Sequence, residues 1–278
     1  MQFLIIPVLA FAPGIFWLWL AYRWDKYQPE PKWLVIRTFL FGMVAVLPIL
    51  LIEFLLGLVH FGAANNGGTS ISSAAYESFI VAGFTEELGK FLVVYLTMYK
   101  SPYFDESTDG IIYASAAALG FASVENLFYM IGNGWQIILL RAPISTVSHL
   151  LFSIIWGYPL MLRKLGRRGA TALFLTGLVG AMVFHGLFDF VIFTKSWFAL
   201  LIIPIIGALI VILILMLRHS RRISTFRKGD ARVYNAIQDA TVTCQNCGAV
   251  VNRSARYCTA CGSRLAENNT KQRPAKPN

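Results

Sequence analysis

Residues 197–217 read WFALLIIPIIGALIVILILML, a stretch without a charged side chain. A helix needs about 20 predominantly apolar residues to cross the hydrocarbon core of a bilayer. Six further apolar runs precede this one, at residues 2–22, 33–60, 74–99, 109–131, 137–162 and 168–194. The runs predict an all-α polytopic membrane protein with about seven transmembrane helices.

The composition favours the same class. Of the 278 residues, 56% are hydrophobic and only 14% are charged, whereas a soluble domain usually carries about a quarter charged residues. The first run lacks the basic start and the small-residue end of a cleavable signal peptide, so we expect it to be a retained helix.

The loops between the runs alternate in basic charge. The first loop holds Arg23, Lys26 and Lys32, and the fifth, 163–168, holds four basic residues. The second and fourth loops, 61–73 and 132–134, hold none. Because cytoplasmic loops carry the excess of Lys and Arg, we expect the N-terminus outside and the C-terminal tail in the cytosol.

The C-terminal tail is strongly basic. Residues 218–278 hold 12 Lys/Arg and 3 Asp/Glu, whereas residues 1–217 hold 12 and 11. A basic segment beside a membrane is attracted to anionic lipid, which we expect here. Nucleic-acid binding is the weaker interpretation of the same charge.

All four cysteines lie in this tail, as Cys244-Gln-Asn-Cys247-Gly and Cys258-Thr-Ala-Cys261-Gly. Two such pairs bring four thiolates to one ion and predict a closed, structural Zn²⁺ site. The segment is similar to the short zinc ribbons appended to many prokaryotic membrane proteins. So small a domain takes most of its folding free energy from the metal. We expect it to bind an unidentified cytosolic partner, and a redox-active cysteine pair is the less favoured alternative.

Several ionisable residues fall inside the apolar runs, where they are costly and therefore usually functional. In the third run, Glu86 and Lys90 stand one helical turn apart, and Glu87 points about 100° away. The structural alternative is a buried ion pair with one carboxylate bonded to a neighbouring helix. We favour a general base among these carboxylates.

The next three runs carry further polar groups. These are Phe121, Glu125 and Asn126 in the fourth run, Arg141, His149 and Ser153 in the fifth, and His185 and Asp189 in the sixth. An aspartate one turn from a histidine can fix its tautomer. At a rise of 1.5 Å per residue, the groups of all four runs lie about 6 to 18 Å below the predicted outer surface. This common depth predicts one site, open to the outside.

In this order the motifs resemble the PrsW family of intramembrane proteases. The resemblance rests on Glu86-Glu87-x-x-Lys90, Phe121-x-x-x-Glu125-Asn126, Arg141 with His149, and His185-x-x-x-Asp189. Two further segments look like parts of the family: Asp25-x-x-x-Pro29-Glu30-Pro31 and Asp109-Gly110-Ile111-Ile112-Tyr113. The resemblance covers roughly residues 20–195, and the ribbon lies outside it.

The resemblance implies hydrolysis of peptide bonds in membrane-tethered proteins, such as an anti-sigma factor, in a bacterial plasma membrane. It places the catalytic set at Glu86, Glu87, Glu125, His149, His185 and Asp189, with Lys90, Asn126 and Arg141 in support. We hypothesise that Glu86, or less readily Glu87, takes a proton from water, and that the histidines donate to the oxyanion or the leaving amine. We favour a metal-free site. The alternative is zinc held by Glu125, His149 and His185.

The predicted organisation has four parts. These are a transmembrane, protease-like domain at 1–217 with its core at 20–195, a basic juxtamembrane linker at 218–243, a zinc ribbon at 244–265 and a disordered tail at 266–278. Two other functions use the same residues. A proton- or ion-coupled transporter would use the buried carboxylates and histidines as a relay, and a scaffold without catalysis would act through its ribbon.

Overall fold

The computed structural model describes residues 2–25, 28–63, 70–194, 197–224 and 241–265, except 253, 254, 256 and 259. The chain divides into two compact units, Met1–Ser224 and Thr225–Asn278. Most of the predicted linker and the predicted disordered tail at 266–278 lie outside the described residues.

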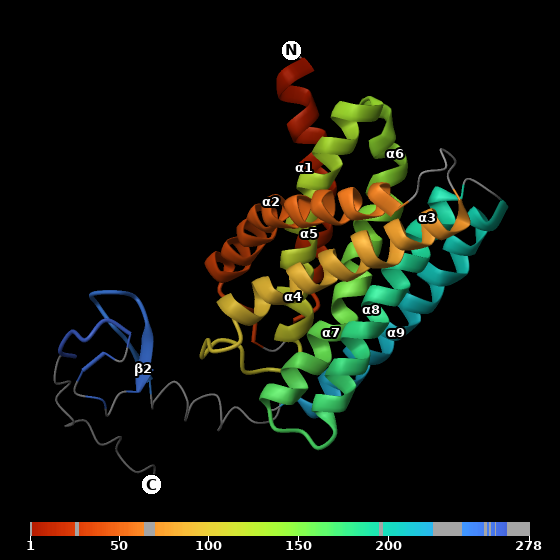
Figure 1. The fold of residues 1–278 in the computed structure, drawn as a ribbon. Helices are drawn as coiled ribbons and strands as arrows, with labels where there is room; N and C mark the ends of the chain where they lie inside the picture. Colours follow the sequence, from red (N-terminus) through yellow and green to blue (C-terminus); the bar gives the residue numbers. More distant parts are fainter. Residues whose placement is uncertain are drawn as a thin grey trace, which may run out of the picture. The chain divides into compact units, whose positions relative to one another are not determined.

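The first unit is a bundle of long helices (Figure 1). They are α1 (Gln2–Tyr22), α2 (Lys32–Ala63), α5 (Asp109–Asn133), α7 (Thr146–Lys164), α8 (Ala170–Phe193) and α9 (Ile202–Ile223). Within the described residues, six helical segments are long and apolar enough to cross a membrane. They run over Ile5–Tyr22, Lys32–Leu58, Asp109–Asn133, Trp135–Lys164, Ala170–Phe193 and Ala199–Ile223. Six of the seven predicted spans are thereby confirmed by length and composition.

The remaining predicted span, 74–99, is helical but is not among these six. It consists of α3 (Ile71–Tyr76), a π-helical stretch η1 (Glu77–Phe84) and α4 (Thr85–Thr97). Its charged residues lower its apolar character, since Glu86, Glu87 and Lys90 all lie on α4.

A second π-helical stretch lies before α7. The chain passes through η2 (Trp135–Ile137), α6 (Ile138–Leu140) and the π-helical η3 (Arg141–Ser145) before α7 begins. Each π-helix thus directly precedes a helix that carries candidate site residues. A π-helical turn adds one residue to a helix and so changes the direction in which later side chains point, which is why such turns are common at functional sites.

Helix α5 forms the centre of the bundle and packs against α1, α2, α4 and α7. Small residues allow the close approach, as is usual between membrane helices. A Cβ atom on Gly120 would lie 2.0 Å from the Phe39 carbonyl oxygen of α2, so only glycine fits there. Helix α7 packs in turn against α8 and α9, which brings the polar residues of α4, α5, α7 and α8 together.

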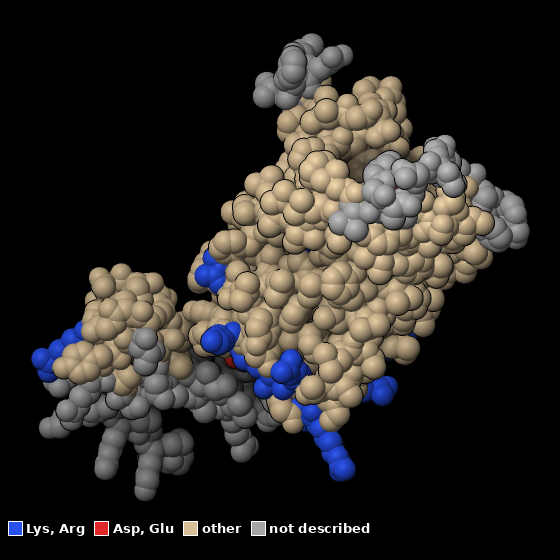
Figure 2. All heavy atoms as spheres, in the orientation of Figure 1, with Lys and Arg blue, Asp and Glu red and all other residues tan. Residues whose placement is uncertain are grey.

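Basic residues gather at one end of this unit. On the face drawn in Figure 2, the described Lys and Arg side chains of the bundle lie near the end at which α5 begins, and the opposite end shows none. The exposed basic residues of the described bundle include Arg23, Lys32, Lys100, Arg167 and Arg168.

The second unit contains a two-stranded antiparallel sheet, in which β1 (Thr241–Thr243) pairs with β2 (Val250–Asn252). Each cysteine pair forms a similar turn. The amide of Gly248 donates to the Cys244 carbonyl, and the amide of Gly262 donates to the Cys258 carbonyl, both at 2.8 Å. Both glycines have positive φ, 72° and 73°, which explains why glycine follows each pair.

Candidate active site

Lys90 occupies the centre of the candidate site and is fully buried. Its Nζ atom donates to Glu86 Oε2 at 3.0 Å and to Glu87 Oε1 at 2.8 Å. The same atom lies 2.9 Å from His149 Nδ1 and 4.6 Å from the centre of the Phe121 ring. One ammonium therefore offsets the charge of two adjacent carboxylates and joins α4 to α7.

Glu87 is fully engaged in hydrogen bonds. Its Oε2 atom accepts from Ser153 Oγ at 3.1 Å and from Trp156 Nε1 at 3.0 Å. Its Oε1 atom contacts Lys90 and lies 3.2 Å from His185 Nδ1. A carboxylate held from four sides orients its neighbours, and it has little freedom to take a proton itself.

His185 faces Glu86 through its other nitrogen. Because Nδ1 donates to Glu87, the neutral ring presents a lone pair on Nε2. That atom lies 3.7 Å from Glu86 Oε2 and 3.5 Å from Asp189 Oδ2. The sequence predicted that Asp189 orients His185, but the structure gives the shorter contact to Glu87, one helix away. Phe152 stacks on the imidazole at 4.9 Å between ring centres and fixes its plane.

His149 is held by both of its nitrogens. Nδ1 accepts from Lys90, and Nε2 lies 2.8 Å from Glu125 Oε2. Glu125 in turn pairs with Arg141, whose Nη2 lies 2.9 Å from the same oxygen. Arg141 comes from the π-helical η3 and its guanidinium lies 3.8 Å from the centre of the Tyr129 ring. The Glu125–Arg141 pair therefore fixes the orientation of His149.

Asn126 contacts Arg141 of this pair. Its Oδ1 accepts from Arg141 Nε at 2.8 Å, and its Nδ2 donates to Thr146 Oγ1 at 3.0 Å and to the Ala10 carbonyl at 3.4 Å. The resemblance implied a supporting part for Asn126. Its described contacts hold the guanidinium of Arg141.

The structure adds residues that the sequence analysis did not single out. Trp156 donates to Glu87, and Glu53 of α2 accepts from Thr85 Oγ1 at 3.2 Å, beside Glu86. Glu53 could have been found from the sequence, because it is the one acidic residue in the apolar run 33–60. Trp156 could not, since an indole in an apolar run usually packs in the core.

Three of these side chains could hold a metal ion. Glu86, His149 and His185 are buried, and each offers one ligand atom within 4.8 Å of the others. Two histidines and a carboxylate are a donor set used by catalytic zinc in proteases. The residues therefore fit a metal by type and proximity. The set differs from the predicted one, because Glu86 takes the place of Glu125, which is bound to Arg141 and His149.

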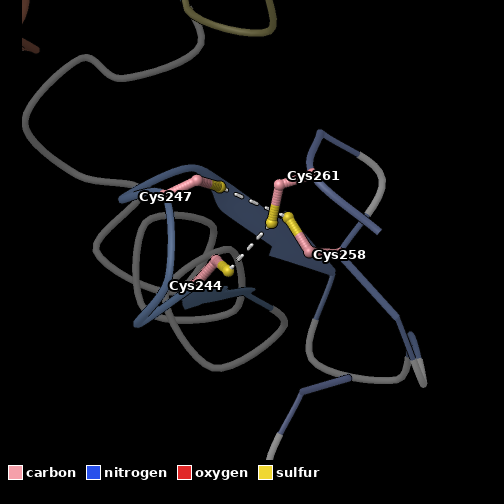
Figure 3. Close-up of side chains that lie close together, drawn as sticks. All are labelled: Cys244, Cys247, Cys258 and Cys261. Atoms are coloured by element: carbon pink, nitrogen blue, oxygen red, sulfur yellow. Dashed lines mark hydrogen bonds between the residues drawn. The ribbon is translucent and has the colours of Figure 1, made fainter. Parts of the chain in front are cut away.

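The ribbon forms a second candidate metal centre. The four sulfur atoms lie within 4.8 Å of one another, with Cys244 Sγ 3.7 Å from Cys261 Sγ and Cys247 Sγ 3.6 Å from Cys258 Sγ. Figure 3 shows the four thiols pointing toward a common centre. All four cysteines are free of disulfides. This arrangement suits tetrahedral zinc coordination by four thiolates.

A bundle of apolar helices that buries acid–base residues at one internal point is what an intramembrane protease requires. Comparison with known proteins identifies the particular family. Residues 30–218 match the family described as PrsW family intramembrane metalloprotease, and residues 243–265 match a zinc-ribbon domain. The chain belongs to the PrsW protease family and is a multi-pass intramembrane protease with a C-terminal zinc ribbon.

Similar curated proteins carry the same name. The chain is 36% identical to protease PrsW of Bacillus subtilis (strain 168) over 186 residues, which is 66% of this chain and 81% of the relative. It is 34% identical to protease PrsW of Geobacillus kaustophilus (strain HTA426), over 66% of this chain and 78% of the relative. The protease PrsW of Clostridioides difficile (strain 630) is also 34% identical, over 72% and 81%. No solved structure matches the chain.

Proposed function

We propose that Glu86 and His185 form the reacting pair of this protease and that the remaining polar residues position them. The observation that carries the proposal is the contrast between the two glutamates. Glu87 is bonded from four sides, whereas Glu86 receives its one described hydrogen bond from Lys90. Glu86 Oε2 and His185 Nε2 lie 3.7 Å apart, so both contact the same small space. A water molecule in this space contacts the Glu86 carboxylate, which acts as the base, and His185 Nε2, which is a second hydrogen-bond acceptor.

Glu86 takes a proton from this water as it attacks the peptide carbonyl, and returns the proton to the leaving amine. Lys90, whose ammonium contacts Glu86, places a positive charge beside this space and stabilises the negative charge that develops on the carbonyl oxygen. Glu87 keeps the lone pair of His185 directed at Glu86. Glu125, Arg141 and Asn126 hold His149 in place.

A metal bound to Glu86, His149 and His185 would supply Lewis acidity to the water and to the carbonyl oxygen. The family description favours such a metal. The positioning residues would keep the same roles with a metal bound, because Glu87 still orients His185 and the Glu125–Arg141 pair still orients His149. Lys90 donates to His149 Nδ1, the nitrogen that faces Glu86, so a metal bound to that nitrogen would take the place of this hydrogen bond.

The substrates of an intramembrane protease are membrane proteins, and we infer a single-span, membrane-anchored class. The end of the bundle at which basic side chains gather supports a cytosolic position for the α4–α5 and α7–α8 loops. This orientation puts the N-terminus outside and the C-terminal ribbon in the cytosol of a plasma membrane. Cleavage is then expected in the outer half of the bilayer, where Glu86 is predicted to lie.

The ribbon is proposed to hold one structural zinc ion and to bind a cytosolic partner. Support comes from the convergence of its four thiols and from the match to a zinc-ribbon domain. The basic residues that end α9, Arg221 and Arg222, are suited to contact anionic lipid.

The test is co-expression with a panel of tagged single-span membrane proteins. Wild type should shorten at least one of them at a bond in the outer half of its span, and Glu86→Gln and His185→Ala should not, at matched membrane levels. Glu77→Gln is the matched control, because it changes an exposed carboxylate on the same helical segment. Equal cleavage by Glu86→Gln and wild type would exclude Glu86 as the base. Loss of cleavage in a membrane-permeable chelator, restored by zinc, would assign a metal to the site if a Cys258→Ser/Cys261→Ser variant, which lacks the ribbon's ligands, behaves in the same way.

A further inference from the structure

A second group of carboxylates lies where α5 begins, far from the active site. Asp25 and Glu30 come from the loop between α1 and α2, Asp105 and Glu106 come from the end of the α4–α5 loop, and Asp109 is the first residue of α5. Two sets of three could each surround one ion: Asp25, Glu106 and Asp109, and Glu30, Asp105 and Asp109. In each set one oxygen per residue lies within 4.8 Å of the others, and Asp109 belongs to both.

Several of these oxygens lack the partners that a buried carboxylate requires. Glu106 is only 3% exposed, and neither of its oxygens has a hydrogen-bond partner of ordinary geometry; the nearby hydroxyl of Ser224 is its one favourable neighbour. Asp109 is fully buried, and its Oδ2 accepts from the amides of Asp105 and Glu106 at 2.7 and 2.6 Å. Its Oδ1 has no donor of ordinary geometry among the described residues, and the Glu30 carboxyl lies beside this side chain.

The described residues supply little positive charge to this cluster. Within the described part of the chain, Glu30, Glu106 and Asp109 belong to no ion pair. Lys164 lies near Asp105 and Asp109, but its Nζ atom donates to the Ser101 carbonyl at 2.7 Å. Burial raises the pKa of Glu30 to about 7, although Tyr113 donates to it at 2.5 Å. Charged carboxylates in such surroundings need a cation, because desolvation and mutual repulsion otherwise disfavour them.

We propose that this cluster binds a hard divalent cation, Ca²⁺ or Mg²⁺, that ties the α1–α2 loop to the start of α5. Hard cations take oxygen ligands, and all the candidate ligands here are carboxylate oxygens. Asp105 is exposed and leaves the site an opening to solvent. Asp109 and Glu125 are sixteen residues apart on α5, about 24 Å along its axis, so this site is separate from the active site.

Terbium luminescence can test the proposal on the full-length protein in detergent. Tb³⁺ replaces Ca²⁺ at oxygen sites, and its emission is sensitised by nearby aromatic rings, here Trp24 beside Asp25 and Tyr113 bonded to Glu30. We expect saturable emission that Ca²⁺ or Mg²⁺ competes away. Glu106→Gln and Asp109→Asn should weaken Tb³⁺ binding on the order of tenfold or more, because ligand charge sets affinity. Glu77→Gln, which changes an exposed carboxylate outside both candidate metal sites, should leave it unchanged.

Thermal unfolding distinguishes a cluster that binds a cation from a cluster whose carboxylates share protons. With a bound cation, Ca²⁺ or Mg²⁺ raises the Tm of the wild type above its value in chelator, and Glu106→Gln loses that rise. If the cluster only shares protons, neither cation moves the Tm, and Glu106→Gln is more stable than wild type in chelator because one repulsive charge is gone. That second result, or Tb³⁺ binding unaltered by Glu106→Gln and Asp109→Asn, would overturn the proposal.

Discussion

Glu86 and Glu87 are neighbours in the chain, yet their carboxylates have different surroundings. Successive residues of a helix point about 100° apart. Glu87 therefore points to α7 and α8, where Ser153, Trp156 and His185 contact it. Glu86 points to the space that His185 Nε2 also lines. The same residue type is therefore proposed to serve structure at Glu87 and chemistry at Glu86.

This difference predicts opposite phenotypes for two isosteric changes. Glu86→Gln should reduce cleavage by about 10²–10⁴-fold, the usual worth of a general base, with a Tm near that of wild type. Glu87→Gln should cost about 1–3 kcal/mol of stability, because its amide group would face donors such as Ser153 and Lys90. Cleavage rates and Tm values of the purified proteins measure both. A normal Tm for Glu87→Gln would contradict its assignment as the residue that orients the site.

Arg141 is predicted to act through geometry as well as charge. Its guanidinium reaches Asn126 and Glu125 at once and lies over Tyr129, and a lysine ammonium cannot make these contacts together. Arg141→Lys should therefore lower kcat on the order of tenfold, the usual effect of losing a supporting contact, and leave KM nearly unchanged. Arg167→Lys, an exposed basic residue, is the control. An unchanged kcat would show that Arg141 contributes positive charge alone.

At the scale of the elements, close packing of α8 on η1 holds His185 in place. A Cβ atom on Gly186 would lie 2.9 Å from the Cα atom of Phe79, whereas one on Gly180 of the same helix meets nothing within 4 Å. Gly186→Ala should cost about 1–3 kcal/mol, as overpacking does, and should reduce cleavage by moving His185. Gly180→Ala should be neutral or stabilising by up to about 1 kcal/mol. Equal Tm values for both variants would show that η1 yields at this contact.

The elements also show why part of the site was predictable from sequence. Apolar runs gave the helices, and ionisable residues within them gave Glu86, Glu87, Lys90, Glu125, His149 and His185, which the structure brings together. Helical periodicity paired His185 with Asp189, but the shorter contact of His185 is to Glu87 on another helix. Contacts between helices depend on how each helix is rotated, and a π-helical turn such as η1 or η3 changes that rotation without a clear mark in the sequence.

At the scale of the whole molecule, the chain combines two units whose stabilities have different sources. The bundle is stabilised by packing of apolar helices around α5. In the ribbon, Cys244, Cys258 and Val251 form a small buried cluster with a few partly buried neighbours. A cluster of that size cannot supply the folding free energy of a domain, so we expect a metal to supply it. The cysteine spacing predicted the four-cysteine cluster, because two Cys-x-x-Cys pairs bring four thiols to one point.

The two units should consequently respond separately to loss of metal. In a Cys258→Ser/Cys261→Ser variant we expect the zinc content of the purified protein, measured by elemental analysis, to fall by one ion per chain. The Tm of the membrane unit should stay unchanged, because these residues belong to the other compact unit. Metal that remains in this variant and disappears on adding His149→Ala belongs to the site of Glu86, His149 and His185. Unaltered zinc content in the cysteine variant would mean that the ribbon folds without the ion, against the free-energy argument above.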